Sequence, residues 1–132
     1  MTETKVPEDL AYTKSHEWVR IEGDVATVGI TDHAQSELTD IVFVDLPSVG
    51  KDTKAGTSAL ALESVKTVAD VNAPGNGTVI EVNSELKNHP EWINQDPYGK
   101  GWLFKVRLKG PIPGETLLTA EAYRSLIASG TY

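Results

Sequence analysis

Short apolar runs alternate with turn-forming residues along most of the chain. Val, Ile, Leu and aromatic residues gather in these runs, and Gly, Pro, Asn and Asp separate them, which predicts β-strands joined by turns. The segment 41–46 is almost continuously apolar, which indicates a buried strand. Many short strands with few helices predict a sandwich or a small barrel. The expected strands span residues 12–21, 25–30, 41–46, 57–62, 68–72, 78–83 and 102–108.

Helix signals are confined to three short segments. Thr31 and Asp32 can each cap a helix, and Asp32 and Gln35 have the spacing of a capping box. Thr119 can cap the last helix, whose apolar side would contain Leu118, Ala122, Leu126 and Ile127. We therefore predict helices at residues 32–38 and 120–128 and one helical turn near 84–87.

The length of 132 residues predicts a single domain. Residues 1–8 are polar and are expected to be frayed, because chain ends are poorly ordered unless tertiary contacts hold them. We expect the core to span about 12–109 and the C-terminal helix about 119–128.

The composition excludes several classes of function. With no cysteine in the chain, disulfides, thiolate metal sites and cysteine nucleophiles are excluded. The formal net charge of −7 argues against nucleic-acid binding, which needs a basic surface, and favours protein partners with basic docking surfaces. No apolar run approaches the ~20 residues of a membrane span. The first residues lack the features of a targeting peptide, so we expect a cytoplasmic protein.

Catalytic and metal-binding patterns are weak. His16, His33 and His89 show no metal-ligand spacing. His16 and Glu17 lie on the first predicted strand, where neighbours face opposite sides, so they are not expected to line one pocket. The sequence has neither a nucleophile elbow nor a phosphate-binding loop. We therefore expect no enzyme activity and no metal site.

One lysine lies between two well-predicted strands. The polar segment 63–67 joins the runs 57–62 and 68–72, so a hairpin would hold Lys66 at an exposed tip. The turn has no Gly, Pro or Asn-Gly, which weakens the hairpin signal. Two interpretations remain open from the pattern alone: an ordinary surface charge, or an amine mounted on a rigid support for covalent modification.

Six segments of the chain stand out together, at residues 13–19, 28–35, 40–47, 63–67, 77–83 and 96–102. In this order, these segments resemble the glycine cleavage system H protein family. They include the Ser-His-Glu-Trp stretch around Glu17 and the Glu-Ser-Val-Lys-Thr stretch around Lys66, and the resemblance covers about residues 12–123. The chain departs from the family at Thr67, where Ala is common, and at Thr39, where Gly is frequent.

The resemblance implies a mainly β barrel-sandwich hybrid of the biotinyl/lipoyl-carrier type, with short helices and a C-terminal helix. It implies lipoic acid attached to Lys66 and a carrier rather than an enzyme. The carrier would take the aminomethyl group of glycine from a pyridoxal-phosphate glycine decarboxylase to an aminomethyltransferase. Dihydrolipoyl dehydrogenase would reoxidise the arm, and a lipoate-attaching enzyme would load Lys66.

The resemblance also implies roles for residues around the lysine. Ser15, Glu17 and Asp70 would form a cleft that shelters the loaded arm. The residues Glu63, Ser64 and Val65 would help the lipoate-attaching enzyme to recognise the turn.

Two other carriers remain as alternatives. One is a lipoate-relay protein for 2-oxoacid dehydrogenases, which the sequence does not separate from the glycine cleavage carrier. The other is a biotin carrier, which usually has Met on both sides of its lysine, whereas Lys66 lies between Val65 and Thr67.

Overall fold

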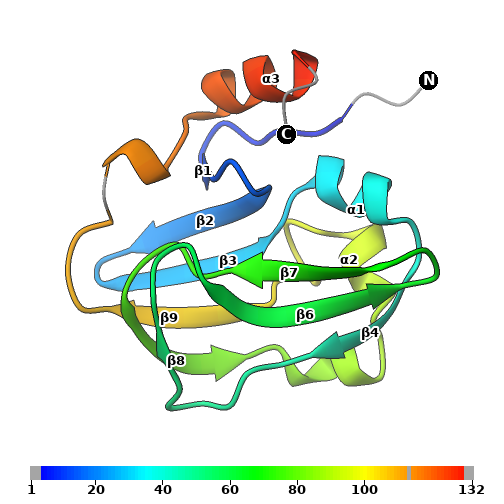
Figure 1. Cartoon of the computed structure of the whole chain (residues 1–132), viewed down its shortest axis with the longest axis horizontal. Helices are drawn as coiled ribbons and strands as arrows, with labels where there is room; N and C mark the ends of the chain where they lie inside the picture. Colours follow the sequence, from blue (N-terminus) through cyan, green and yellow to red (C-terminus); the bar gives the residue numbers. More distant parts are fainter. Residues whose placement is uncertain (1–3, 113, 130–132) are drawn as a thin grey trace.

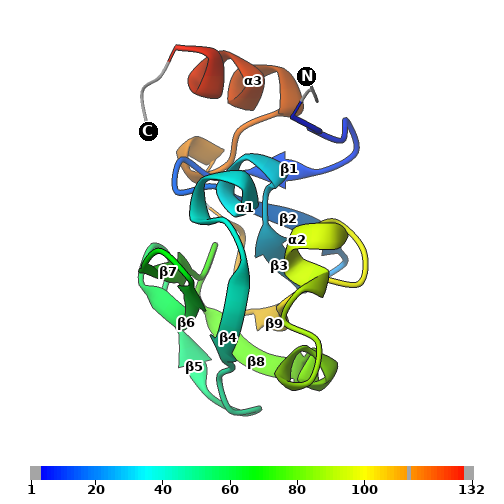
Figure 2. The ribbon, with the colours of Figure 1, turned by 90° about the vertical axis from the view of Figure 1, so that its right-hand side faces the viewer.

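Two antiparallel sheets form the body of the protein. The computed structural model describes residues 4–112 and 114–129. A six-stranded sheet has the order β1-β2-β3-β9-β8-β5, and a three-stranded sheet with the order β4-β6-β7 lies against it (Figures 1 and 2). The strands are β1 Ala11–Tyr12, β2 Glu17–Glu22, β3 Val25–Ile30, β4 Ile41–Asp45, β5 Asp52–Thr53, β6 Ser58–Ser64, β7 Val68–Asn72, β8 Gly77–Val82 and β9 Phe104–Leu108.

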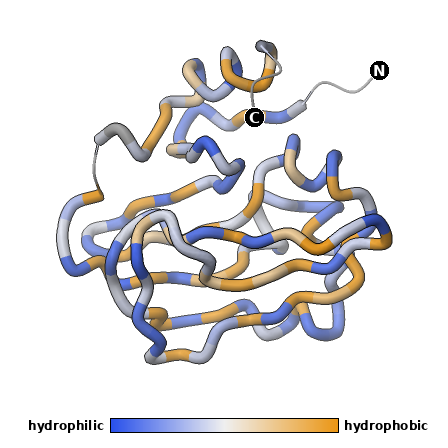
Figure 3. Tube along the Cα trace, in the orientation of Figure 1, coloured by the Kyte–Doolittle hydropathy of each residue, from blue (hydrophilic) through white to orange (hydrophobic). Residues whose placement is uncertain are grey.

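The main core lies between the two sheets. Apolar and polar residues alternate along much of the strands (Figure 3), so that each strand contributes one face to the interior. Val28 and Phe104 from the larger sheet and Leu62 and Val71 from the smaller one are buried in the same cluster. This packing confirms the predicted mainly β fold with two layers.

A second apolar cluster lies beneath the C-terminal helix α3, Ala120–Ala128. Tyr123 of α3 stacks on Tyr12, with ring centroids 4.8 Å apart. The predicted helix is confirmed, with Thr119 as its N-cap. Its apolar side was only partly predicted, because Ala122 is exposed and the buried anchor is Tyr123.

The remaining helices are short. α1, Asp32–Leu38, has the predicted bounds, and its N-cap is Thr31, whose hydroxyl accepts a hydrogen bond from the Ala34 amide. Asp32 instead accepts a hydrogen bond from the Gln35 side chain. The predicted turn at 84–87 is the 3-10 helix η1, Ser84–Lys87. The sequence pattern did not predict α2, Trp92–Gln95, or the 3-10 helix η2, Gly114–Thr116.

The prediction that strand 41–46 is buried holds for Ile41 and Val44, which are each 3% exposed, but not for the two residues between them. β4 is an edge strand of the smaller sheet, and the side chains of Val42 and Phe43 are 53% and 52% exposed. The register with β6 shifts between Ile41 and Phe43. Such a bulge interrupts the alternation of faces, which leaves two successive apolar side chains on the surface.

Residues 4–8, which belong to the segment expected to be frayed, make contacts with the body of the protein. The Lys5 amide donates to the Asp32 carboxylate at 2.8 Å, and the Tyr98 hydroxyl donates to the Lys5 carbonyl at 2.6 Å. Val6 is buried, and Arg124 of α3 pairs with Glu8. These contacts hold the segment against the body, whereas residues 1–3 lie outside the described part.

Candidate carrier site

Lys66 lies in the tight turn that joins β6 and β7. The Ser64 amide donates to the Thr67 carbonyl at 2.8 Å. The Ser64 hydroxyl oxygen accepts hydrogen bonds from the Lys66 and Thr67 amides at 3.1 and 3.0 Å. None of these turn residues has a positive φ. The Ser64 side chain therefore closes a turn that has no glycine, as serine hydroxyls do in many turns.

Further contacts hold the backbone of this turn and leave the lysine accessible. The Val65 amide donates to the Asp40 carbonyl at 3.0 Å, which ties the turn to the start of β4. Lys66 is exposed, and its Nζ lies 3.4 Å from the Glu37 carbonyl at the end of α1. The structure thus combines a fixed backbone with an exposed amine.

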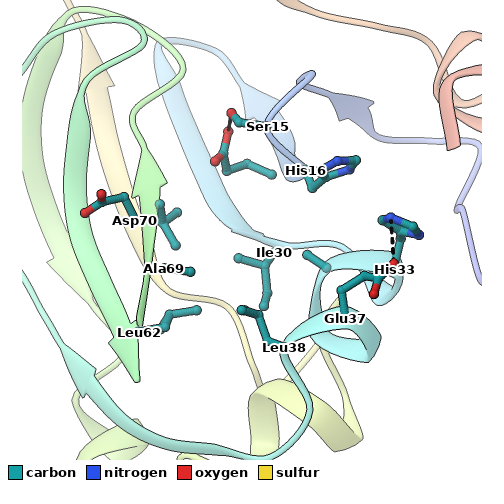
Figure 4. A pocket seen from close by; sticks show the side chains of 12 residues that line it. Ser15, His16, Ile30, His33, Glu37, Leu38, Leu62, Ala69 and Asp70 are labelled. Carbon is teal, nitrogen blue, oxygen red and sulfur yellow. Dashed lines mark hydrogen bonds and ion pairs between the residues drawn. The ribbon is translucent and has the colours of Figure 1, made fainter. Parts of the chain in front are cut away.

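A cleft of about 410 Å³ is lined by Glu37, the residue whose carbonyl oxygen lies near the Lys66 amine. It lies between α1, the start of β2 and the inner face of β6 and β7 (Figure 4). Apolar side chains make up most of its wall. The lining residues are Ser15, His16, Glu17, Ile30, His33, Ala34, Glu37, Leu38, Leu62, Ala69, Asp70 and Val71.

Glu17 is the buried acid of the cleft. Its side chain is only 1% exposed. One carboxylate oxygen accepts hydrogen bonds from the hydroxyls of Thr13 at 2.5 Å and Ser15 at 2.7 Å, and the other accepts from the Asn72 amide at 3.2 Å. Burial raises the pKa of Glu17 above its ordinary value, and these three hydrogen bonds partly oppose the shift.

The prediction that His16 and Glu17 face different sides was wrong. Residues 13–16 form a turn before β2 rather than a strand, and His16 has a φ of 72°. This left-handed conformation changes the direction of the chain, so that both side chains line the cleft.

Tyr123 is a neighbour of the cleft that the sequence pattern did not predict. The Tyr123 hydroxyl lies 2.7 Å from His16 Nδ1 and 2.7 Å from the Thr31 hydroxyl. The rings of His16 and His33 lie 4.9 Å apart. Burial, and then the charge of His33, lower the pKa of His16. No local sequence signal joins these residues, because α3 is remote in the chain.

The structure brings Ser15 and Glu17 together but directs Asp70 elsewhere. Along β7, Ala69 and Val71 face the interior, whereas Asp70 is exposed. The Asp70 carboxylate accepts a hydrogen bond from the Ser58 hydroxyl at 2.9 Å. Figure 4 shows its side chain pointing away from the cavity. Asp70 thus borders the cleft through its place on the strand.

The cleft fits a long, mainly apolar chain with a polar end. Apolar side chains form the wall near α1, and Glu17 lies beside Asn72, at the end of β7 remote from Lys66. The length of β7 from Val68 to Asn72 corresponds to roughly 13 Å. A lipoyl chain joined to a lysine amine is long and mainly apolar, and a polar group carried at its end would meet Glu17, so the residues present fit that cofactor.

Two facing sheets with an exposed lysine at a hairpin tip define a carrier domain of the biotinyl/lipoyl type. The family model for the glycine cleavage H-protein matches residues 10–130. This chain therefore belongs to the glycine cleavage H-protein family, the lipoylated carriers of the glycine cleavage system.

Individual relatives agree with the family match. The glycine cleavage system H protein of Rubrobacter xylanophilus is 59% identical over 119 residues, which are 90% of this chain and 92% of that protein. The corresponding protein of Symbiobacterium thermophilum is 50% identical over 125 residues, or 95% and 98% of the two chains. The crystal structure of the H protein from Mycobacterium marinum superposes with a TM-score of 0.86 at 42% identity, covering 93% of this chain and 99% of the other.

Family membership confirms the carrier interpretation. The protein is a non-catalytic carrier that bears a lipoyl-lysine. Its partners are the P, T and L proteins of the glycine cleavage system, which are the glycine decarboxylase, the aminomethyltransferase and the dihydrolipoyl dehydrogenase. The match supports the lipoyl carrier over the biotin carrier. Among the helices in the described ranges, none has the length and apolar character needed to cross a membrane.

Proposed function

We propose that Lys66 is the lipoyl attachment site of this carrier and that the cleft beside Ser15 and Glu17 shelters the loaded arm. The observation that carries the proposal is the exposed Lys66 amine, whose Nζ lies 3.4 Å from the carbonyl of Glu37, a lining residue of a cleft with a buried carboxylate. Lipoic acid supplies a disulfide that can accept a one-carbon group through one sulfur while the other leaves as a thiol.

The turn presents the amine for acylation. Amide formation removes the positive charge of Lys66, and this loss is tolerated because the side chain forms no ion pair among the described residues. The Ser64 bonds fix the backbone on both sides of the amine. Glu63, Ser64 and Val65 thereby form the surface of the turn that the lipoate-attaching enzyme would recognise.

Glu17 supplies negative charge where water is scarce. An ammonium group brought beside this carboxylate would favour its ionised form and lower its pKa. The hydroxyls of Thr13 and Ser15 hold the carboxylate in place. The apolar wall excludes water from the carried group, which would protect the group from hydrolysis. Asp70 adds negative potential from the edge of the cleft.

Mass spectrometry tests the attachment site directly. The full chain, incubated with a lipoate-attaching enzyme, lipoate and ATP, should gain one lipoyl group, and peptide mapping should place it on Lys66. Lys66→Arg keeps the charge but should gain none and should support no glycine decarboxylation. Its melting temperature should stay within about 1 °C, because exposed substitutions seldom change stability. A lipoyl group on another lysine would overturn the assignment.

We also propose a cytoplasmic location. The relatives named above are bacterial proteins, and a dithiol arm reoxidised by its own dehydrogenase requires a compartment that does not oxidise thiols indiscriminately. Fractionation of the source cells, with the chain detected by antibody, tests this location.

A further inference from the structure

We propose that the outer face of the smaller sheet, next to Lys66, is the docking surface for the enzyme that attaches lipoate. The surface consists of an apolar tip patch, defined as Val42, Phe43, Val65 and Val68, and of acidic side chains around it. The inference rests on the proposed function of Lys66 and adds a partner surface that lies outside the cleft.

Exposed apolar side chains are concentrated at this tip. In the described part of the chain, six large hydrophobic side chains are strongly exposed, and four of them form the tip patch. Val65 and Val68 are 68% and 62% exposed, and Val42 and Phe43 are each more than half exposed. Scattered single apolar residues are normal on a protein surface, whereas a contiguous patch indicates an interaction site.

The strand register assembles the patch from distant parts of the chain. Phe43 of β4 lies opposite Glu63 of β6, and Glu63 lies opposite Val68 of β7. The three residues therefore form one cross-strand row, and all three are exposed. The bond from the Val65 amide to the Asp40 carbonyl brings Val65 beside the start of β4.

The bulge in β4 increases the apolar area of this row. A regular strand would turn either Val42 or Phe43 toward the core, whereas the shifted register leaves both exposed. Bulges frequently re-aim side chains next to functional sites. Here the exposed pair lies beside the turn that carries Lys66.

Acidic side chains surround the apolar patch. The exposed acids on and beside the outer face are Asp40, Asp45, Glu63 and Asp70. Within the described ranges, none of these carboxylates forms an ion pair. Their negative potential complements a partner whose apolar docking surface has a basic rim.

The lipoate-attaching enzyme is the partner that this position favours. An enzyme that acylates Nζ must bring the Lys66 amine into its own active site, so it must contact the side chains around the turn. Because Phe43 comes from another strand, the docking enzyme would recognise the folded protein rather than a linear peptide.

Matched substitutions test the surface. Val68→Thr and Phe43→Thr remove apolar character and place at each position a β-branched residue that suits a strand. Val49→Thr is the control, because Val49 is also 62% exposed but lies outside the patch. The measurement is the initial rate of lipoyl addition to Lys66, followed by intact mass at several carrier concentrations. Melting curves check the fold of each variant.

We expect kcat/KM for lipoylation to fall about tenfold in Phe43→Thr and about threefold in Val68→Thr, as for anchors of an interface. Val49→Thr should stay within about twofold. Raising the salt concentration from about 50 to 200 mM should slow wild-type lipoylation, because it screens the acidic rim. Equal rates for all three variants would overturn the docking surface while leaving Lys66 as the attachment site.

Two further outcomes would assign the patch to another occupant. Fully lipoylated Phe43→Thr should support glycine decarboxylation with an unchanged KM for the carrier. A normal lipoylation rate with a raised KM would move the patch to the decarboxylase. The second such outcome is that the wild type sediments as a dimer and Phe43→Thr as a monomer, while the lipoylation rate is unchanged. The tip patch would then be a self-association surface. Failure of the wild type to accept lipoate at Lys66 would instead contradict the proposed attachment site.

Discussion

Two tight turns lie at opposite ends of the cleft, and both form without glycine. In residues 64–67 the hydroxyl of Ser64 accepts two backbone amides. In residues 13–17 the hydroxyl of Thr13 accepts the Glu17 amide at 3.1 Å and donates to the Glu17 carboxylate. The first turn projects its lysine into solvent, whereas the second buries its glutamate.

The two turns differ in backbone strain. The hairpin turn contains no residue with positive φ, but the turn before β2 holds His16 at 72°. A non-glycine residue in this region persists only where surrounding contacts compensate for the cost, and the ring of His16 contacts Tyr123 and His33. The turn that buries Glu17 therefore depends on tertiary contacts, whereas the turn around Lys66 is held largely by bonds within itself.

The largest change in stability is expected from a substitution in the turn at residues 13–17, which buries Glu17. Glu17→Ala leaves Thr13, Ser15 and the Asn72 amide without their acceptor, which should lower the free energy of unfolding by about 2 kcal/mol. It should also shorten the lifetime of the loaded arm without preventing loading. Urea denaturation measures the first effect, and ammonia release from the loaded carrier measures the second.

Asp70→Asn is the control for that experiment. Because the Asp70 carboxylate is exposed and bonds to Ser58, the substitution should change stability by less than about 0.5 kcal/mol. If the loaded arm of Asp70→Asn had a lifetime as short as that of Glu17→Ala, the two acids would contribute equally to the shelter, contrary to the burial of Glu17 and the outward direction of Asp70.

A smaller effect is expected at the exposed turn. Ser64→Ala removes the acceptor of two amides that water can reach, so we expect a loss of only about 1 kcal/mol. The amides of Lys66 and Thr67 should exchange hydrogen faster, and lipoylation should slow. Ser48→Ala, at another exposed loop serine, is the control. Unchanged exchange at Lys66 in Ser64→Ala would show that the hydroxyl does not hold the turn.

The smallest effect concerns pH. Burial raises the pKa of Glu17 above the ordinary 4.5, so the folded chain retains this proton to a higher pH than the unfolded chain. The stabilising contribution of Glu17 is therefore greatest below pH 4.5 and declines as pH rises to the folded pKa. Glu17→Gln lacks this decline.

The measurement is the difference in free energy of unfolding between Glu17→Gln and the wild type, taken from pH 4 upward. As pH rises, the free energy of unfolding of Glu17→Gln should increase relative to that of the wild type. The lowered pKa of His16 acts in both proteins and should cancel in the difference. A difference that is constant with pH would contradict the raised pKa of Glu17.

Local patterns predicted the elements that depend on neighbouring residues. The hairpin around Lys66 followed from two apolar runs with a polar reversal between them. The starts of α1 and α3 followed from Thr31 and Thr119, because a cap acts within one turn of the helix. Local patterns failed for β4, because its place at a sheet edge depends on which strands pair with it.

By itself, the sequence determined the hairpin that holds Lys66 at its tip and the family to which the chain belongs. The tertiary structure decided what surrounds that lysine: the burial of Glu17, the outward direction of Asp70 and the joint exposure of Val42 and Phe43. Side-chain direction depends on the φ of one turn residue, on strand register and on contacts between remote segments. These properties arise only when the two sheets and α3 pack together.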